Sequence, residues 1–145
     1  MKYGRVYVED VQVGSEIPPL VKGPIQQIQL TRYAGASGDF NPIHQDDEFA
    51  KAAGMGGVFG HGMLTMGFVA QAVTDWAGSG TVRKIGVRFV GLVRLKDTVT
   101  CRGRVLEKSS KDGVHTVELE LTAENQRGEK IVTGRATVGL PSRTP

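Results

Sequence analysis

Residues 63–77 read MLTMGFVAQAVTDWA, and apolar side chains in this run occur on almost every side of a helix. A helix that is hydrophobic all round is normally covered by other elements. At the α-helical rise, a helix of this length spans roughly 22 Å. The following Gly78-Ser79-Gly80 ends the run. The sequence therefore predicts one long, buried helix at the centre of the fold.

From Val82 onward the hydrophobic period changes to two, which is typical of strands with one buried face. Segments 108–113 and 125–128 contain the Gly and the Asp or Asn of hairpin turns. We expect an antiparallel meander whose apolar face closes on the helix, which is an α+β fold. The inward positions of this alternation are Ile85, Val87, Phe89, Val99, Cys101, Val105, Val117, Leu119, Leu121, Val132, Ala136 and Val138.

The part before the long helix is less regular. Residues 1–24 are interpreted as a polar arm with short extended pieces, because Pro18-Pro19 is incompatible with regular structure. The alternation in residues 25–30 predicts a strand, and Thr31 is a suitable N-cap for a short helix through Ala36. Residues 141–145 are expected to form a loose tail. The length fits one domain, residues 1–145.

The segment 33–50, which reads YAGASGDFNPIHQDDEFA, contains the candidate chemistry. Asp39 and His44 stand five residues apart, a spacing that does not place them on one helical face. Asn41-Pro42 between them favours a turn. We expect a tight turn that brings the carboxylate and the imidazole together as an acid/base pair.

A short helix should follow this turn. Asp46, Asp47 and Glu48 would place acidic groups in its first turn, where they suit the helix dipole, and Gly54 is a suitable C-cap. A glycine-rich loop, residues 55–62, then leads into the long helix.

The motif GDFNPIH, residues 38–44, resembles the signature of the MaoC-like, R-specific enoyl-CoA hydratases, and Tyr33, Asp46 and Ala50 fit that signature. A second block, GHGML at residues 60–64, resembles the loop before that family's central helix. Within the family, the catalytic subunits of the (3R)-hydroxyacyl-acyl-carrier-protein dehydratases are the most similar in character. The resemblance covers most of the chain and implies a hot-dog fold, in which an antiparallel sheet wraps around one long helix.

The resemblance also implies a reaction. Asp39 and His44 would position one water against C3 of a trans-2-enoyl thioester. One group would take the water proton and the other would deliver a proton to C2 on the same face, giving the (3R)-hydroxy product; the reverse reaction is dehydration. Which residue has which role stays open. No metal or redox cofactor is expected, and the acyl group would arrive on coenzyme A or on an acyl carrier protein.

Two further residues receive roles from the same resemblance. Gly62 lies where the long helix begins, so its backbone N–H is a candidate donor to the thioester oxygen as that oxygen gains charge. Asn41 has two readings that can both hold: it forms the turn, or its amide orients His44 or Asp39.

The candidates for bounding the acyl chain are Phe59 and Met63, near the helix start and in the loop before it, and Phe40 beside the turn. Phe68, deeper in the helix, is better explained as core. The basic residues Arg83, Lys84 and Arg88 fit either a solvated strand face or contacts with the phosphates of coenzyme A or an acidic carrier protein.

The remaining reactive side chains have plainer interpretations. His61 is expected to be bonded locally where the helix begins. No ligand spacing links His44, His61 and His115, the three histidines of the chain, so we predict no metal site. Cys101 is expected to be a small core residue.

Composition narrows the class of protein. The chain is 39% hydrophobic and 23% charged, with a net charge of +3, which does not indicate nucleic-acid binding. The single cysteine, the polar start and the polar residues within the apolar runs lead us to expect a cytoplasmic protein without a signal peptide or membrane span. From the resemblance we expect a homodimer, or a heterodimer with a sister subunit that lacks the Asp–His pair.

Two alternatives to a hydratase or dehydratase remain. A non-catalytic subunit that shapes an acyl tunnel for a partner would have lost Asp39 or His44, and both are present. A thioesterase of the same fold would use a carboxylate on the central helix, and Asp75 is late in that helix. Acyl chain length, and coenzyme A against acyl carrier protein, are left open by the sequence.

Overall fold

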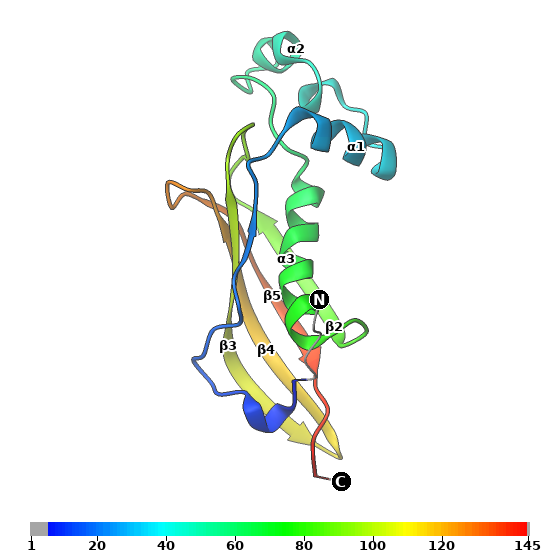
Figure 1. Ribbon diagram of the computed structural model, residues 1–145, viewed down its shortest axis with the longest axis vertical. Helices are drawn as coiled ribbons and strands as arrows, with labels where there is room; N and C mark the ends of the chain where they lie inside the picture. The colour runs from blue at the N-terminus through cyan, green and yellow to red at the C-terminus, as the bar shows by residue number, and fades with distance from the viewer. Residues whose placement is uncertain (1–5, 145) are drawn as a thin grey trace.

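A computed structural model describes residues 6–144 and has a five-stranded antiparallel sheet packed beside one long helix (Figure 1). The fold is therefore α+β, as predicted. Two shorter helices lie beyond one end of the sheet, near the start of the long helix. The elements are η1 Val8–Asp10, β1 Leu20–Lys22, α1 Gln27–Ser37, η2 Pro42–His44, α2 Asp47–Ala52, α3 Gly62–Ala77, β2 Val82–Phe89, β3 Val99–Lys111, β4 Val114–Glu124 and β5 Lys130–Gly139.

The sheet order is β1-β3-β4-β5-β2, so the expected simple meander is only partly correct. β3, β4 and β5 are consecutive hairpin partners, and Asp112-Gly113 forms a turn in which both residues have positive φ, 52° and 75°. β2 comes before β3 in the chain but pairs with β5, with Val87 opposite Gly134. Hydrophobic periodicity reports which face a residue occupies and carries no information on which strands are neighbours.

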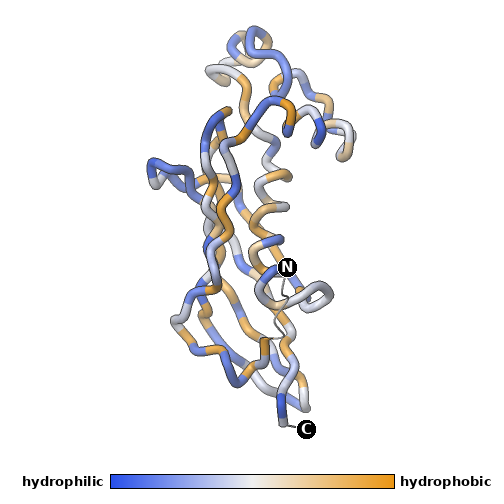
Figure 2. Tube along the Cα trace, viewed as in Figure 1, coloured by the Kyte–Doolittle hydropathy of each residue, from blue (hydrophilic) through white to orange (hydrophobic). Residues whose placement is uncertain are grey.

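α3 packs one face against the sheet. Its buried residues recur at helical spacing: Thr65, Phe68, Val69, Ala72, Val73 and Ala77. Hydrophobic residues concentrate along α3 and the strands (Figure 2). The prediction that α3 is covered on all sides is wrong for the single chain, because Met63 is 56% exposed and Asp75 also faces solvent.

Residues 25–30 are not a strand. α1 begins at Gln27, and Thr31 lies inside it with its hydroxyl donating to the carbonyl oxygen of Gln27. Leu30 and Ala34, four residues apart, form its buried face. The alternation of apolar residues and glutamines was too short to separate period two from the helical period, and tertiary packing on Leu30 favours the helix.

The two ends of the chain are more ordered than expected. Val8, Val11 and Ile17 are buried, and β1 pairs with β3, so this segment contributes to the core and to the sheet and is not a detached polar arm. The tail is not loose over residues 141–144: Arg143 donates two hydrogen bonds of 2.7 Å to the carboxylate of Asp10. Residues 1–5 and 145 lie outside the described part.

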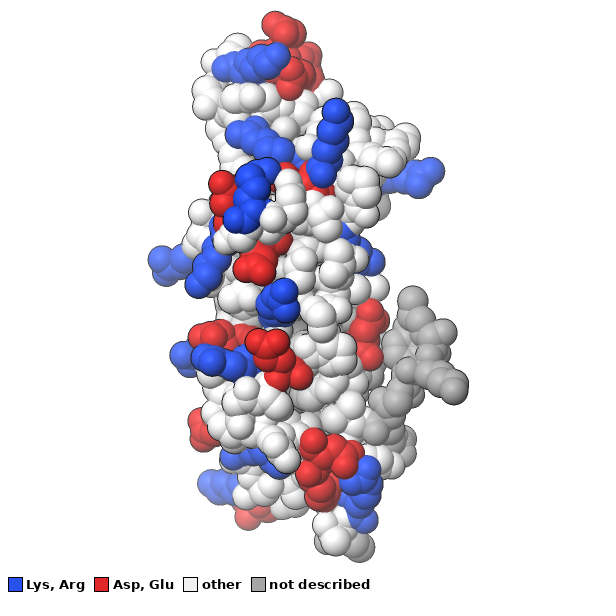
Figure 3. Space-filling view, turned by 60° about the vertical axis from the view of Figure 1, so that its left-hand side comes forward, with Lys and Arg blue, Asp and Glu red and all other residues white. Residues whose placement is uncertain are grey.

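No helix within residues 6–144 has the length and hydrophobicity needed to cross a bilayer. On the face of the molecule in Figure 3, positive and negative side chains are interspersed. Arg104 and Glu120, on the neighbouring strands β3 and β4, form a cross-strand ion pair at 3.5 Å.

Candidate active site

The loop between α1 and η2 holds Asp39. α1 ends at Ser37, and the following Gly38, with a φ of 78°, caps it and turns the chain away from the helix axis. The side-chain oxygen of Asn41 accepts from the N–H of Ile43, which caps η2, and the N–H of Asn41 donates to Oδ1 of Asp39 at 3.2 Å. The side chain of Asn41 thus forms the turn, while its main chain holds the carboxylate.

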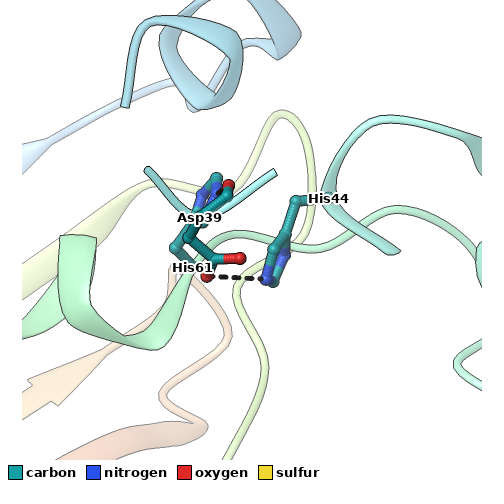
Figure 4. Close-up of side chains that lie close together, drawn as sticks. All are labelled: Asp39, His44 and His61. Carbon is teal, nitrogen blue, oxygen red and sulfur yellow. Dashed lines mark hydrogen bonds and ion pairs between the residues drawn. The ribbon is translucent and has the colours of Figure 1, made fainter. Parts of the chain in front are cut away.

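Asp39 and His44 lie together, as the turn predicts. Nε2 of His44 is 3.8 Å from Oδ2 of Asp39 (Figure 4). The imidazole is buried, with 7% of its side chain exposed, whereas the carboxylate is 49% exposed. Nδ1 of His44 lies 2.7 Å from the carbonyl oxygen of Phe59, which can only accept, so Nδ1 carries the hydrogen. In a neutral His44, Nε2 is therefore an acceptor that faces the carboxylate.

The distance between Nε2 of His44 and Oδ2 of Asp39 decides how the two groups can interact. A distance of 3.8 Å is too long for a direct hydrogen bond. Two acceptors at this distance suit one water, which donates one hydrogen to each and keeps its oxygen lone pairs free. Such a water is oriented as a nucleophile and has a proton acceptor beside it.

His61 completes the cluster, and the expectation of a local contact for it is wrong. Its ring stacks on that of His44, with centroids 4.0 Å apart and planes at 29°. Its Nε2 lies 3.1 Å from the carbonyl oxygen of Asp39, 22 residues earlier in the chain. Burial lowers the pKa of His61 below its usual value of 6.5, against the opposing effect of the hydrogen bond to Asp39. The sequence signal for this role was the place of His61 within the second motif block, GHGML at residues 60–64.

The three side chains also fulfil the distance requirement for a metal site, since one ligand atom from each of Asp39, His44 and His61 lies within 4.8 Å of the others. The absence of ligand spacing in the sequence was therefore a poor guide to their proximity. The geometry nevertheless does not suit a shared ion. Imidazole lone pairs lie in the ring planes, and two stacked rings at 29° direct them along nearly parallel planes rather than to one point.

The loop that carries the Phe59 carbonyl is fixed by Arg94. Its guanidinium donates to the carbonyl oxygens of Gly57 and Met55 at 2.9 and 2.6 Å. Asp97, which is buried, accepts from the N–H of Arg94 at 2.8 Å. A planar guanidinium fork serves two carbonyls at once, which a lysine does not. Sequence reasoning missed this arginine because its partners lie 37 and 39 residues away.

Gly62 is the first residue of α3, where the N–H groups have no intrahelical acceptor. It directly follows His61, so the start of α3 lies beside the Asp39–His44 pair. A methyl group on Gly62 would meet ring atoms of Phe89 at 3.2–3.3 Å. Glycine therefore allows the ring of the edge strand β2 to approach the start of the helix.

The three predicted acyl-pocket residues differ in how far they are buried. Phe59 is buried and its ring contacts that of His44 edge to face, with centroids 4.9 Å apart. Phe40 is 68% exposed and Met63 is 56% exposed in the single chain, so for these two a role beside the acyl chain stays a prediction. Phe59 supports the imidazole of His44 directly. A substitution of Phe59 would therefore disturb His44 as well as any acyl pocket, and would not report on the preference for acyl chain length alone.

The three predicted phosphate-binding residues lie at different positions along β2. The guanidinium of Arg83 lies against Gly139, near the end of β2 that is remote from Gly62. Arg88 lines an open groove of about 630 Å³ on the sheet, together with Lys130 and Arg135. Lys84 is exposed, and its register opposite Thr137 puts it on the same face as Arg88. A role in phosphate binding stays a prediction for all three.

Comparison with known proteins shows the family of this chain. The model of the MaoC like domain matches residues 10–127. The chain belongs to the MaoC-like family. An (R)-specific enoyl-CoA hydratase of Rhodospirillum rubrum is 30% identical over 139 residues, covering 94% of this chain and 93% of that protein.

Solved structures of similar proteins have the same fold. The unliganded R-hydratase PhaJ1 of Pseudomonas aeruginosa superimposes with a TM-score of 0.84 at 28% identity, covering 96% of this chain and 88% of that one. The ChsH1–ChsH2 complex of Mycobacterium tuberculosis contains a chain with a TM-score of 0.76 and 28% identity, covering 89% of this chain and 98% of that one. The predicted hot-dog fold of the family is thus confirmed for this chain.

Proposed function

We propose that this MaoC-like protein adds water to trans-2-enoyl thioesters, and removes it from (3R)-3-hydroxyacyl thioesters, by acid/base catalysis at Asp39 and His44. The observation that carries the proposal is the 3.8 Å separation of Nε2 of His44 and Oδ2 of Asp39. The names of relatives support the reaction class: the Rhodospirillum rubrum protein is an (R)-specific enoyl-CoA hydratase, and PhaJ1 is an R-hydratase.

The chemistry follows from the two acceptors. A water held between Asp39 and His44 attacks C3 of the conjugated thioester, so a C3–O bond forms and the C2–C3 π bond breaks. One of the pair accepts the proton that this water loses. The electron pair moves onto the thioester oxygen as an enolate, and the pair then gives the proton that it gained from the water to C2, which returns both residues to their starting state. The sum is the addition of one water, and dehydration is the same path reversed.

The enolate oxygen needs a donor, and the N–H of Gly62 fits that need. Oxyanion donors of this kind are typically worth about 3 kcal/mol in the transition state. The positive end of the dipole of α3 adds to the attraction. Because Gly62 follows His61, whose ring stacks on His44, one thioester can reach both the water and this N–H.

The two alternatives receive less support. A non-catalytic subunit has no need for the Asp39–His44 pair. A thioesterase carboxylate at Asp75 would lie near the last turn of α3, roughly 20 Å from Gly62 at the helical rise. The carboxylate of Asp75 accepts from Gln71 on the same exposed side of the helix. Neither reading explains the cluster at the other end of α3.

We also propose that the active form is a dimer joined through β2, either with a second copy or with a sister subunit. β2 is an edge strand, and edges invite pairing. Exposed apolar side chains continue from it beside the start of α3: Phe89 at 46%, Val90 at 49% and Met63 at 56%. A partner on this edge would cover them and close the space for the acyl chain next to Met63.

The test is hydration of crotonyl-CoA and of longer trans-2-enoyl-CoA substrates, followed by loss of the absorbance of the conjugated double bond. The product should be oxidised by an R-specific and not by an S-specific 3-hydroxyacyl-CoA dehydrogenase. Absence of hydration at every chain length, together with absence of dehydration of (3R)-3-hydroxyacyl-CoA, refutes the reaction. An S product refutes its stereochemistry.

A further inference from the structure

His61 connects three segments of the site. It is 1% exposed and immediately precedes α3. Its ring stacks on His44 in η2, and Tyr33 of α1 packs edge to face against it at a centroid distance of 4.8 Å. Its Nε2 lies 3.1 Å from the main-chain oxygen of Asp39. One side chain thus contacts both members of the proposed acid/base pair.

The protonation state of His61 follows from its partners. A carbonyl oxygen only accepts, so Nε2 carries the hydrogen. Nδ1 is buried and has no hydrogen-bond partner within the described residues, so a proton there would be left unsatisfied. The titratable groups that face the ring are Tyr33, Asp39 and His44. Burial lowers the pKa of His61 and so favours the neutral ring.

The other hydrogen bonds of Asp39 are local. Its N–H donates to the hydroxyl of Ser37 and its carboxylate accepts from the N–H of Asn41, both within two residues. Asp39 is exposed and follows Gly38, so these local bonds do not fix the position of the turn relative to α3. The hydrogen bond from His61 to Asp39 spans 22 residues and fixes that position.

We propose that His61 is a positioning residue: its neutral imidazole holds the main chain of Asp39 through Nε2–H and holds the ring of His44 by stacking. The carboxylate and Nε2 of His44 then stay at the separation that one water bridges. His61 itself exchanges no proton with the substrate. This inference rests on the proposed function and names a further residue of the same site.

The experiment compares three substitutions of His61. In Gln the amide nitrogen can occupy the position of Nε2, so His61→Gln keeps the donor to Asp39. In Asn the amide reaches only the position of Nδ1, so His61→Asn loses it, and His61→Phe keeps the ring stack without any donor. His115→Gln is the matched control, since that histidine lies on the β3–β4 hairpin, where Nδ1 contacts Ser110. Thermal unfolding verifies that each variant is folded.

The expected result is a loss of kcat with little change in KM. A displacement of about 1 Å at a catalytic group can cost on the order of 100-fold, so His61→Asn and His61→Phe should lose about 10- to 100-fold in kcat. His61→Gln keeps the donor to Asp39 and loses only the stack on His44, so its kcat should fall by no more than about fivefold and keep the wild-type pH profile. The control should be indistinguishable from wild type.

Two results overturn the inference. Near-normal kcat in all three folded variants would show that the position of Asp39 does not depend on His61. A folded His61→Gln that loses as much as His61→Phe would show that the hydrogen bond to Asp39 does not set the position of the turn, and one that loses a limb of the pH profile would make His61 an acid/base group instead. An inactive wild type refutes the proposed function, and the inference about His61 is then tested by nitrogen NMR of its ring at pH 6.5. A neutral ring with the hydrogen on Nε2 supports the inference. A ring with the hydrogen on Nδ1, or a protonated ring, overturns it.

Discussion

The Nδ1 atom of His44 lies 2.7 Å from the carbonyl oxygen of Phe59. This bond joins the turn that carries the candidate acid/base pair to the loop that leads into α3. It also determines the tautomer. The carbonyl oxygen accepts a hydrogen bond from Nδ1–H, so Nε2 of the neutral ring is unprotonated and faces Asp39. The separation of Nε2 from the carboxylate, and the proposed use of a water between them, depend on this contact.

The start of α3 offers a direct test of the oxyanion donor. Gly62 is the first helical residue, a position that tolerates proline, and His61 before it has extended backbone angles of −58° and 131°. Gly62→Pro therefore deletes the N–H while remaining compatible with the helix. Gly62→Ala adds the same Cβ against Phe89 but keeps the N–H.

The kcat of Gly62→Pro should be about 100- to 1,000-fold lower than that of Gly62→Ala, the range measured for loss of one oxyanion donor. Comparing the two variants with each other cancels the contact with Phe89. Equal kcat values in two folded variants would remove Gly62 from the mechanism.

The pH dependence of stability should carry a contribution from His61. The fold lowers the pKa of this residue from 6.5, so below about pH 6.5 the unfolded chain binds a proton that the folded chain does not. The free energy of unfolding should then fall as pH decreases from 6.5 to the folded pKa, and level off below it. Urea unfolding of wild type and His61→Gln between pH 7.5 and 5 measures this. The variant should lose less stability; parallel curves would contradict the assignment.

The sequence predicted the long helix well and the segment before it poorly. Residues 63–77 are long, apolar and bounded by glycines, so α3 begins within one residue of the expected start. Residues 25–30 are short, and six residues do not distinguish the two periods when glutamine fills the polar positions. The proximity of Asp39 and His44 was predictable because local turn chemistry produces it. His61 and Arg94 were not, because their contacts join segments far apart in the chain.

If the dimer forms through β2, a charged substitution beside β2 should lower the molecular mass of the particle in solution. Val90 follows β2 and is 49% exposed, and a lysine there would place a charge in the proposed interface. Val114, at the β3–β4 turn and 60% exposed, is the matched site. By light scattering, wild type and Val114→Lys should be dimers, or should form a complex with a co-expressed sister subunit. Val90→Lys should shift towards monomer with loss of activity. A fully active wild-type monomer would contradict the proposal.

The central claim is that Asp39 and His44 act as one unit on one water. The most direct measurement is kcat for hydration of a trans-2-enoyl-CoA by Asp39→Asn, His44→Gln and the double variant, each with its fold verified by circular dichroism and thermal unfolding. Each single substitution should lower kcat by roughly 10²- to 10⁴-fold. The double variant should be no more than about tenfold slower than the slower single variant, because residues that act together are not additive. A single variant with near wild-type kcat, or a double variant whose loss is the full product of the two single losses, would contradict the account.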